Sequence, residues 1–459
     1  MARIYKPKKG SEDDVSHFDG SPPIHHASAS QDQLKMLHER GVASIEYEEI
    51  WSRIKIQNFG PIKEGYQEND GYMDIKKVTV FIGDQGSGKS TVAKVISTLT
   101  WLEKAVNRGD VDRDSMNYFK FYDFFDYQRI KNYFKEDTLI DYQGEYVSIL
   151  YDKKKLHAPE ITFKKNSKYR VPKIMYVPSE RNFLSVIEKA NDVKRLPGTL
   201  SDFGDELKNG QIEFSDKKIL LPINDVYYKY NKKNDSSFLI GKDYELNLLE
   251  GSSGFQSLVP LFLVSKFLTQ ELSKGNKILR EQLSVNQSIR RNEEISKVML
   301  DDQLADDEKN KKVKEIDAKY LNICFINIVE EPEQNLFPKS QRNILNSLLE
   351  FNNMNDGNKL ILTTHSPYLI NYLTLAIKAD ALHDKVKTAD AKKKLFKVVP
   401  SNATVKSNEY TIYELNEVDG TIKLLENYKG LPSDENYLNE RLGETNELFA
   451  QLLEIQQGL

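Results

Sequence analysis

Residues 83–90 have the sequence GDQGSGKS, which fits the pattern GxxxxGK[ST] of a phosphate-binding loop. A β-branched run at residues 78–82 precedes the loop, and residues 91–102 have apolar residues at helical spacing. Glycines let the backbone turn closely around an anion, and the free N–H groups at the start of a helix face the same space. The segment therefore predicts a buried strand, an anion-binding turn and a helix in succession.

Each residue type in this loop suits the phosphates of a nucleotide. Lys89 can reach the β- and γ-phosphates as a positive charge, and the Ser90 hydroxyl is a hard oxygen ligand that suits Mg²⁺. A dinucleotide fingerprint is excluded, because the third glycine of GxGxxG is missing. The predicted nucleotide-binding residues are Gly83, Asp84, Gln85, Gly86, Ser87, Gly88, Lys89, Ser90 and Thr91.

Two carboxylates, Glu330 and Glu331, directly follow a second apolar run at residues 323–329. Open parallel sheets bind ligands at the carboxyl ends of their strands. One acid can hold Mg²⁺ there, while the other orients or deprotonates a water. His365 follows a third run, at residues 360–364, and can donate a hydrogen bond to a γ-phosphate or a water. Acidic loops and strand-end histidines are often structural, so it is their order after the phosphate loop that favours a catalytic site.

The charge balance and the single cysteine exclude several classes of protein. The 459 residues include 65 Lys and Arg against 69 Asp and Glu, a net charge of −4, which excludes a globally basic nucleic-acid coat or polybasic membrane binder. Cys324 alone can form neither an intrachain disulfide nor a CxxC zinc site. The most apolar run, residues 257–264, is too short to span a membrane. We expect a cytoplasmic protein without membrane contact.

The order of the phosphate loop, EEPE at 330–333 and THSP at 364–367 resembles the ABC-type ATPase heads of the SMC and OLD families. The resemblance implies an α/β fold: an ABC-type P-loop NTPase head with a mixed β-sheet lobe and a helical insertion, plus a small C-terminal α+β segment. It implies ATP and Mg²⁺ as ligands. The implied roles are Mg²⁺ binding by Ser90 and the Walker B acid Glu330, catalysis by the base Glu331 and by Lys89, and a switch function for His365.

The same resemblance assigns the segment at residues 250–256 (EGSSGFQ) to a degenerate signature motif. Its usual leucine is Gly251 and its second position is Ser253, so a small-residue helix cap is the alternative. In this family each ATP lies between the phosphate loop of one head and the signature of another. The resemblance therefore implies a homo-oligomer of at least two copies. The signature residues acting in trans are Ser252, Ser253, Gly254 and Gln256.

Residues 176–181 (YVPSER) occupy the place of a Q-loop but contain no glutamine. Arg181 is left with two alternatives, contacts to nucleotide or partner and a salt-bridged loop. For the whole chain we expect a flexible arm over residues 1–45, an ATPase head over 46–400 and a C-terminal α+β extension over 401–459. The helical, charged insertion of the head is expected at about 258–320.

About 160 residues without sustained heptads separate the phosphate loop from the signature, so a long SMC-type arm is not expected. Only 93 residues follow Ser366 and they contain no Asp-x-Asp, so an OLD-type Toprim nuclease is not expected either. The chain instead resembles the stand-alone ATPase subunits of bacterial anti-phage systems, with PARIS first and Septu second. The implied partners are a separate Toprim or HNH effector nuclease and a phage-encoded trigger.

A DNA-repair or clamp-type ATPase, similar to RecF, is the alternative function. Two features motivate it: aromatics interleaved with lysines at residues 118–134, and a basic run at residues 385–397. Such aromatics can stack bases and such lysines can meet phosphates. A small core with a partner face and a solvated helix face are the favoured interpretations of these two features. Nucleic acid therefore remains a candidate partner.

Overall fold

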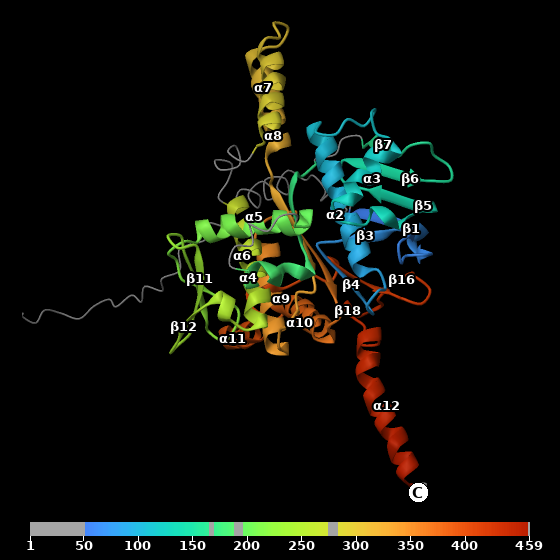
Figure 1. Cartoon of the computed structure of the whole chain (residues 1–459), viewed down its shortest axis with the longest axis vertical. Helices are drawn as coiled ribbons and strands as arrows, with labels where there is room; N and C mark the ends of the chain where they lie inside the picture. Colours follow the sequence, from blue (N-terminus) through green and yellow to red (C-terminus); the bar gives the residue numbers. More distant parts are fainter. Residues whose placement is uncertain (1–50, 165–168, 188–195, 274–282, 458–459) are drawn as a thin grey trace, which may run out of the picture. The chain divides into compact units, whose positions relative to one another are not determined.

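The computed structural model describes residues 51–164, 169–187, 196–273 and 283–457. The predicted N-terminal arm lies outside these residues. The described residues form one larger mixed sheet, two smaller antiparallel sheets and a two-stranded antiparallel ribbon, with helices on both faces of the mixed sheet (Figure 1). Among the described residues, no helix is long and apolar enough to cross a membrane.

The larger sheet has seven strands, and five consecutive strands in it run parallel to one another. The runs predicted as strands at 78–82, 323–329 and 360–364 form three of these, confirming the expected α/β fold. All residues of those three strands are buried, as in sheets covered on both faces. The strand order is β2 (Gly65–Tyr66), β16 (Thr421–Leu424), β15 (Tyr410–Leu415), β4 (Val78–Gly83), β14 (Lys359–Thr364), β13 (Cys324–Glu330) and β8 (Pro172–Val177).

One face of this sheet packs against α2 (Lys89–Arg108), which a five-stranded antiparallel sheet covers from the other side. Phe121 and Phe125 of α3 (Tyr118–Asp126) are fully buried in this layer, so part of the aromatic segment at 118–134 forms core. The five strands of this antiparallel sheet are, in order, β3 (Met73–Ile75), β1 (Ser52–Phe59), β5 (Phe134–Gln143), β6 (Val147–Asp152) and β7 (Glu160–Phe163). The short helices of the same part of the chain are η1 (Asn69–Gly71) and η2 (Lys131–Tyr133).

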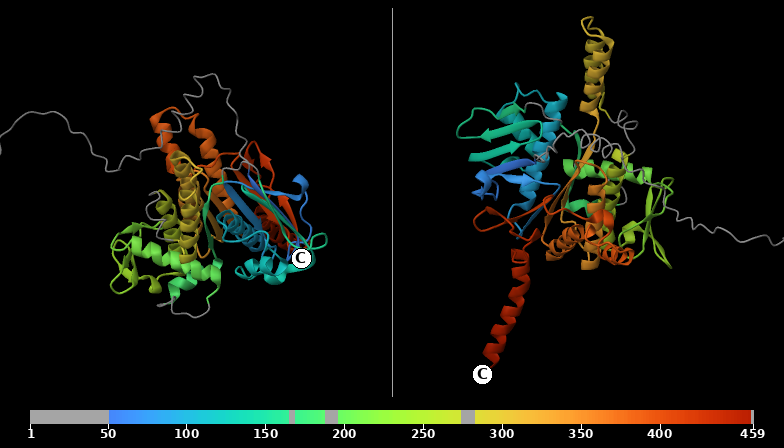
Figure 2. Two further views of the ribbon diagram at one scale, coloured as in Figure 1. Left: turned by 90° about the horizontal axis from the view of Figure 1, so that it is seen from above. Right: turned by 180° about the vertical axis from the view of Figure 1, so that it is seen from behind.

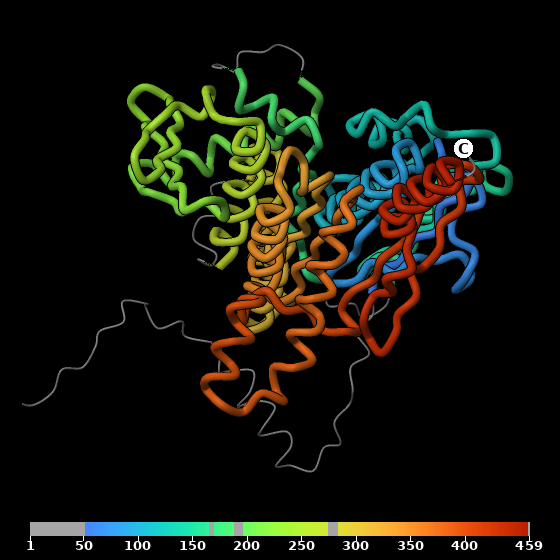
Figure 3. Tube along the Cα trace, turned by 90° about the horizontal axis from the view of Figure 1, so that it is seen from below, coloured from blue at the N-terminus to red at the C-terminus, as the bar shows by residue number. Residues whose placement is uncertain are grey.

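The other face is covered by helices that form the second core. The helices α6 (Ser253–Ser273) and α9 (Pro338–Asn353) lie next to each other (Figure 3), and α10 (Pro367–His383) packs on α9. Next to α6 lie α5 (Gly198–Glu213), α4 (Phe183–Val186), η3 (Ser179–Asn182), η5 (Leu248–Glu250) and the second antiparallel sheet, β12 (Glu245–Asn247), β11 (Ser236–Ile240), β10 (Tyr227–Asn231) and β9 (Ile219–Leu220).

The predicted charged insertion contains two further helices, α7 (Val285–Met299) and α8 (Asp306–Tyr320), which pack side by side (Figures 1 and 2). No residue of α7 is buried. Ion pairs join the two helices, with Arg291 Nη2 2.5 Å from Asp317 Oδ1 and Lys319 Nζ 3.1 Å from Glu294 Oε2. The pair is therefore a solvated helical hairpin whose charges face each other.

The predicted C-terminal extension supplies β15 and β16 to the main sheet, where β15 pairs directly with β4. The basic run begins before α11 (Ala389–Val398) and continues along it, with Lys392, Lys393, Lys394 and Lys397 in this helix, which buries no residue. In the last helix, α12 (Tyr437–Gln457), only Leu438 is buried. The small remaining elements are η7 (Ser401–Ala403), β17 (Asn427–Tyr428) and β18 (Leu431–Pro432).

Candidate functional site

The phosphate loop connects β4 to α2 at the carboxyl end of the parallel strands, as the sequence predicts. Gly88 forms the N-cap of α2 with φ 104°, in the left-handed region that favours glycine. A Cβ at this position would lie 2.6 Å from Ile62 Cδ1 and 3.1 Å from Pro61 Cγ. The turn before β2 thus lies in close contact with the loop. Only glycine can adopt this backbone conformation and also fit the space beside Pro61 and Ile62.

Lys89 is buried at the centre of this loop. Its Nζ donates to the carbonyl oxygens of Gly83, at 2.9 Å, and of Asp84, at 2.7 Å. Burial lowers the pKa of Lys89 to about 8, and the charges of Glu331 and Asp84 oppose that shift. The ammonium group of Lys89 is therefore hydrogen-bonded to two loop carbonyls, and the nearby carboxylates of Glu331 and Asp84 favour its charged form.

Glu330, the last residue of β13, is buried and has a hydrogen bond on each carboxylate oxygen. The hydroxyl of Tyr176 donates to Oε1 at 2.5 Å, and the backbone N–H of Ser179 donates to Oε2 at 3.1 Å. The Ser90 hydroxyl stands in the first turn of α2 and is partly exposed. A hydroxyl and a carboxylate are hard oxygen donors, so the chemistry of this pair fits Mg²⁺.

Glu331 lies just beyond β13 with φ 44°, a left-handed conformation that is uncommon outside glycine. Its Oε1 is 3.3 Å from Nε2 of His365, and Nδ1 of the same ring is 3.4 Å from Lys89 Nζ. A protonated Lys89 donates to Nδ1, which leaves Nε2 to carry the proton that Glu331 accepts. The hydrogen bond from His365 is the main reason that the pKa of Glu331 is lowered. Three residues predicted from three separate motifs thus form one chain of contacts.

Glu333 is a site residue that the sequence interpretation did not assign, although it belongs to the EEPE motif. Its Oε1 accepts hydrogen bonds from the Thr364 hydroxyl, at 2.7 Å, and from the His365 backbone N–H, at 2.8 Å. Burial raises the pKa of Glu333. This carboxyl group fixes the strand end that carries the histidine.

Arg181 does not form the salt-bridged loop that was one of the two alternatives, and a contact with nucleotide or partner remains a prediction. Its guanidinium is buried and, within the described residues, forms no ion pair. It donates instead to backbone carbonyl oxygens, two of which belong to Glu330 and Glu331. Arginine side chains that bind distant carbonyls leave no periodic signal, so the sequence did not indicate this role.

The predicted signature segment lies at the start of α6, which begins at Ser253. The N–H of Gln256 donates to the carbonyl of Ser252 at 3.1 Å, and its side chain donates to Leu249 O at 3.0 Å. A Cβ on Gly254 would lie 2.9 Å from Asn335 O, so this turn is in close contact with the loop that follows Glu331. The predicted contact of Ser252, Ser253, Gly254 and Gln256 with a second copy remains a prediction.

The C-terminal helix also reaches the phosphate loop. The hydroxyl of Tyr437 donates to Asp84 Oδ2 at 2.6 Å, which is the main reason that the pKa of Asp84 is lowered. Arg441 in turn donates to the Tyr437 hydroxyl, at 2.9 and 2.8 Å. Tyr437 is 353 positions from Asp84, and no motif links the two in sequence.

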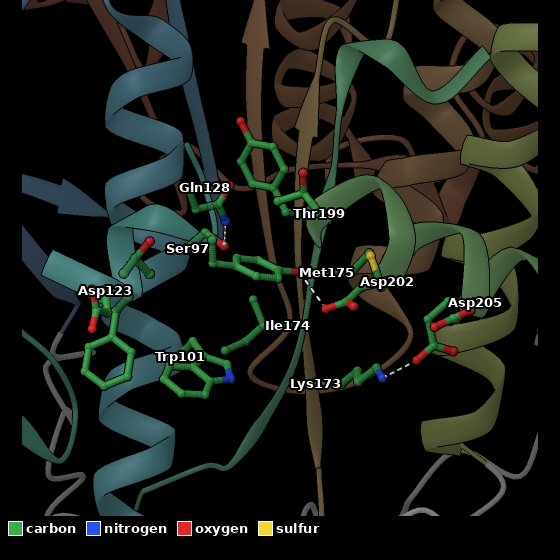
Figure 4. Close-up of a pocket in the computed structure, with 15 residues that line it drawn as sticks. Ser97, Trp101, Asp123, Gln128, Lys173, Ile174, Met175, Thr199, Asp202 and Asp205 are labelled. Atoms are coloured by element: carbon green, nitrogen blue, oxygen red, sulfur yellow. Dashed lines mark hydrogen bonds and ion pairs between the residues drawn. The ribbon is translucent and has the colours of Figure 1, made fainter. Parts of the chain in front are cut away.

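A separate cavity of about 560 Å³ lies between α2, α3, β8 and α5 (Figure 4). Its wall combines aromatic rings, such as Trp101, with carboxylates, such as Asp202. Tyr176 lines this cavity and also donates its hydroxyl to Glu330. The side chain of Tyr176 thus lies between this cavity and Glu330.

Two protein families match the chain. The family described as AAA ATPase domain matches residues 51–324, which is more than half of the chain. The family described as AAA domain, putative AbiEii toxin, Type IV TA system matches residues 327–371. Together these matches include the phosphate loop, Glu330, Glu331 and His365. No curated protein sequence matches the chain.

The comparison with solved structures found SMC heads and an ATP-binding cassette at low identity. The SMC head domain of Thermotoga maritima has 9% identity and a TM-score of 0.34, over 82% of this chain and 98% of that domain. A Pyrococcus furiosus Smc head, bound to the C-terminal domain of ScpA, has 9% identity and a TM-score of 0.34, over 81% and 94%. A dimeric, post-hydrolysis ATP-binding cassette bound to ADP and Pi has 12% identity and a TM-score of 0.27, over 82% and 100%.

Proposed function

Because the chain belongs to the family of AAA ATPase domains, whose match covers residues 51–324, we propose that it hydrolyses ATP at a site shared by two copies of itself. The finer part of the proposal is that this cycle controls a separate effector protein in anti-phage defence. The observation that carries the catalytic part is the chain of contacts Lys89–His365–Glu331 at the ends of neighbouring strands.

The proposed chemistry assigns one task to each group around the γ-phosphate. Lys89 exchanges its loop carbonyls for phosphate oxygens as ATP enters. Glu331, kept ionised by His365, orients the attacking water and accepts its proton. Ser90 and Glu330 would hold Mg²⁺, which would supply charge neutralisation for the transferred phosphoryl group. His365 then senses the γ-phosphate, because its ring lies between Lys89 and Glu331.

A second copy is proposed because the chain has one phosphate loop and one signature segment. The signature turn at the start of α6 has Asn335 and Leu336 as neighbours within its own chain. By the resemblance to ABC-type heads, this turn completes the ATP site of another copy. ATP then acts as the contact between copies, and hydrolysis separates them.

An effector partner is proposed from the resemblance and from one exposed surface. The description of the second matching family names a putative toxin of a type IV toxin–antitoxin system, which supports a setting with two components. The helix α12 begins at the phosphate loop and leaves a row of apolar side chains exposed. Its exposed apolar residues are Leu442, Leu448, Phe449, Leu452, Leu453 and Ile455. We therefore propose a Toprim or HNH nuclease as the controlled protein and a phage protein as the trigger.

A mixing experiment tests the shared site. Lys89→Ala removes the phosphate contact of one chain, and Ser253→Arg blocks the signature of the other. Each variant alone should be inactive. An equal mixture should recover roughly a quarter of the wild-type rate, since half of the dimers are mixed and each keeps one intact site. Ser273→Arg, at the exposed far end of α6, is the matched control and should leave hydrolysis unchanged.

A mixture that stays inactive while both variants still associate would contradict the shared site. The effector part is tested separately, by the mass and identity of proteins that co-purify with wild-type protein and with Glu331→Gln. Strong stimulation of the ATPase by DNA, lost when Lys392, Lys393 and Lys394 are neutralised, would favour the DNA-repair alternative instead.

A further inference from the structure

Arg181 lies in η3, at the carboxyl end of β8, with a side chain that is 1% exposed. Its guanidinium binds four backbone carbonyls from three separate segments. Nη1 donates to Pro178 O at 3.2 Å and to Glu330 O at 2.7 Å, and Nη2 donates to Glu331 O at 2.6 Å. Nε donates to Ser257 O, in α6, at 3.1 Å. One planar side chain thus joins the strand end of β8, the catalytic loop and the signature helix.

The burial of this charge is costly unless its donors are satisfied. Burial lowers the pKa of Arg181 to about 10, so the group stays charged at neutral pH. The carboxylates of Glu333, Glu331 and Glu330 favour the charge from a distance. A rigid fork of five N–H donors matches a ring of carbonyls that a lysine ammonium cannot reach together. The arrangement therefore demands arginine for its geometry as well as its charge.

The contact with Glu331 holds a strained backbone. Glu331 has φ 44°, and such a conformation persists only where its surroundings impose it. Its N–H donates to Thr363 O in β14 at 2.9 Å, while its carbonyl accepts from Arg181. The peptide groups on both sides are fixed, and this directs the carboxylate toward His365.

The contact with α6 lies next to a proline inside that helix. Pro260 has no N–H for the carbonyl of Gln256, and a proline ring loosens the preceding turn of a helix. Ser257, in this turn, accepts from Arg181 through its carbonyl and from Asn335 Nδ2 through its hydroxyl, at 3.0 Å. The signature turn at Ser253 is one helical turn away. A displacement of that turn is therefore passed to Glu331 by two direct hydrogen bonds.

We propose that Arg181 is a positioning residue that joins the signature helix α6 to the backbone of Glu331, so that the rate of hydrolysis depends on the position of α6. The inference rests on the proposed ATPase site and names a residue that takes the place of the missing Q-loop glutamine. Arg181 does not touch ATP. It acts through Glu331, and its loss should change the rate of the chemical step and leave nucleotide binding intact.

The test compares Arg181→Lys with Arg181→Met, by ATP binding and by steady-state hydrolysis. Arg181→Lys keeps the positive charge and a similar side-chain volume but loses the planar fork of N–H donors. It therefore provides a folded test variant if Arg181→Met fails to fold. We expect ATP affinity within about twofold of wild type and kcat at least about tenfold lower, with KM little changed. Arg170→Lys, at an exposed arginine paired with Asp356, is the matched control and should behave as wild type.

A double variant separates positioning from general support. If Arg181 acts through Glu331, Arg181→Lys should cost almost nothing further in a Glu331→Gln background. Full kcat in Arg181→Lys, a raised KM at unchanged kcat, or a loss that adds fully to that of Glu331→Gln would each overturn the proposal. Failure of the shared site would instead appear as the absence of recovery in the Lys89→Ala and Ser253→Arg mixture, in which Arg181 is intact.

Discussion

Nε2 of His365 lies 3.3 Å from Oε1 of Glu331, although the two residues belong to different motifs 34 positions apart. Each follows a parallel strand, and the two strands are neighbours in the sheet. The other ring nitrogen of His365 is 3.4 Å from Lys89 Nζ. One imidazole therefore connects the residue proposed as the base with the residue proposed to bind the γ-phosphate.

Glu331→Gln should bind ATP but hydrolyse it slowly, because an amide cannot accept the proton of the attacking water. We expect a fall in kcat of about 10²- to 10⁴-fold, the range for loss of a general base. Phosphate release measures the rate, and a fluorescent ATP analogue measures binding. Glu308→Gln, on the exposed surface of α8, is the control. Full turnover in Glu331→Gln would show that Glu331 is not the base.

His365→Ala should change the pH dependence of hydrolysis. The hydrogen bond from His365 lowers the pKa of Glu331, so the carboxylate stays ionised below its ordinary value of 4.5. Without the ring, that pKa rises and the acid limb of the kcat/KM profile moves to higher pH. The contribution of this ionised carboxylate to stability is present above the ordinary pKa and is lost as pH falls through the lowered one. An acid limb in the same place would argue against this contact; His383→Ala, at an exposed site, is the control.

Lys89 should make nucleotide binding weaken in mildly alkaline solution. Its pKa of about 8 means that the free enzyme loses this charge as pH rises through that value, and ATP affinity should fall by at most about tenfold per pH unit. Between about 8 and the ordinary 10.5, the unfolded chain binds more protons at this lysine than the folded one. The free energy of unfolding of the nucleotide-free protein should therefore rise with pH over this window. Denaturant titrations of wild type and Lys89→Met test this, and identical pH dependence in both would contradict it.

Gly88→Ala should damage both the fold and the site. The added methyl group meets Ile62 and Pro61, and φ 104° is unfavourable for alanine. We expect a loss of about 1–3 kcal/mol in the free energy of unfolding, the usual cost of such backbone strain, together with weaker ATP binding. Gly443→Ala lies in α12 with open space around the new Cβ and should stabilise by about 0.5–1 kcal/mol. Equal effects of the two changes would refute the role given to Gly88.

Much of the site follows from the sequence, because each motif directly follows an apolar run. Such runs predict buried parallel strands, and parallel strands end at one edge of a sheet. Lys89, Glu331 and His365 could therefore be placed together from their positions after β4, β13 and β14. The glycine spacing likewise identified the loop, since few other residue types adopt its backbone conformations.

Only the tertiary structure decided the contacts that hold these groups in place. Arg181 binds carbonyls of α6 and β13, and Tyr437 binds Asp84 from the far end of the chain. The strand β15 belongs to the predicted C-terminal extension, and its place between β4 and β16 came from the tertiary structure alone. A strand pairs with any suitable strand that the fold places beside it, and a long side chain forms hydrogen bonds with any backbone group within its reach. Those partners lie from 76 to 353 residues away along the chain. They share no period or spacing with the group that meets them, so local sequence determined the strands and loops, while tertiary packing determined which residues support them.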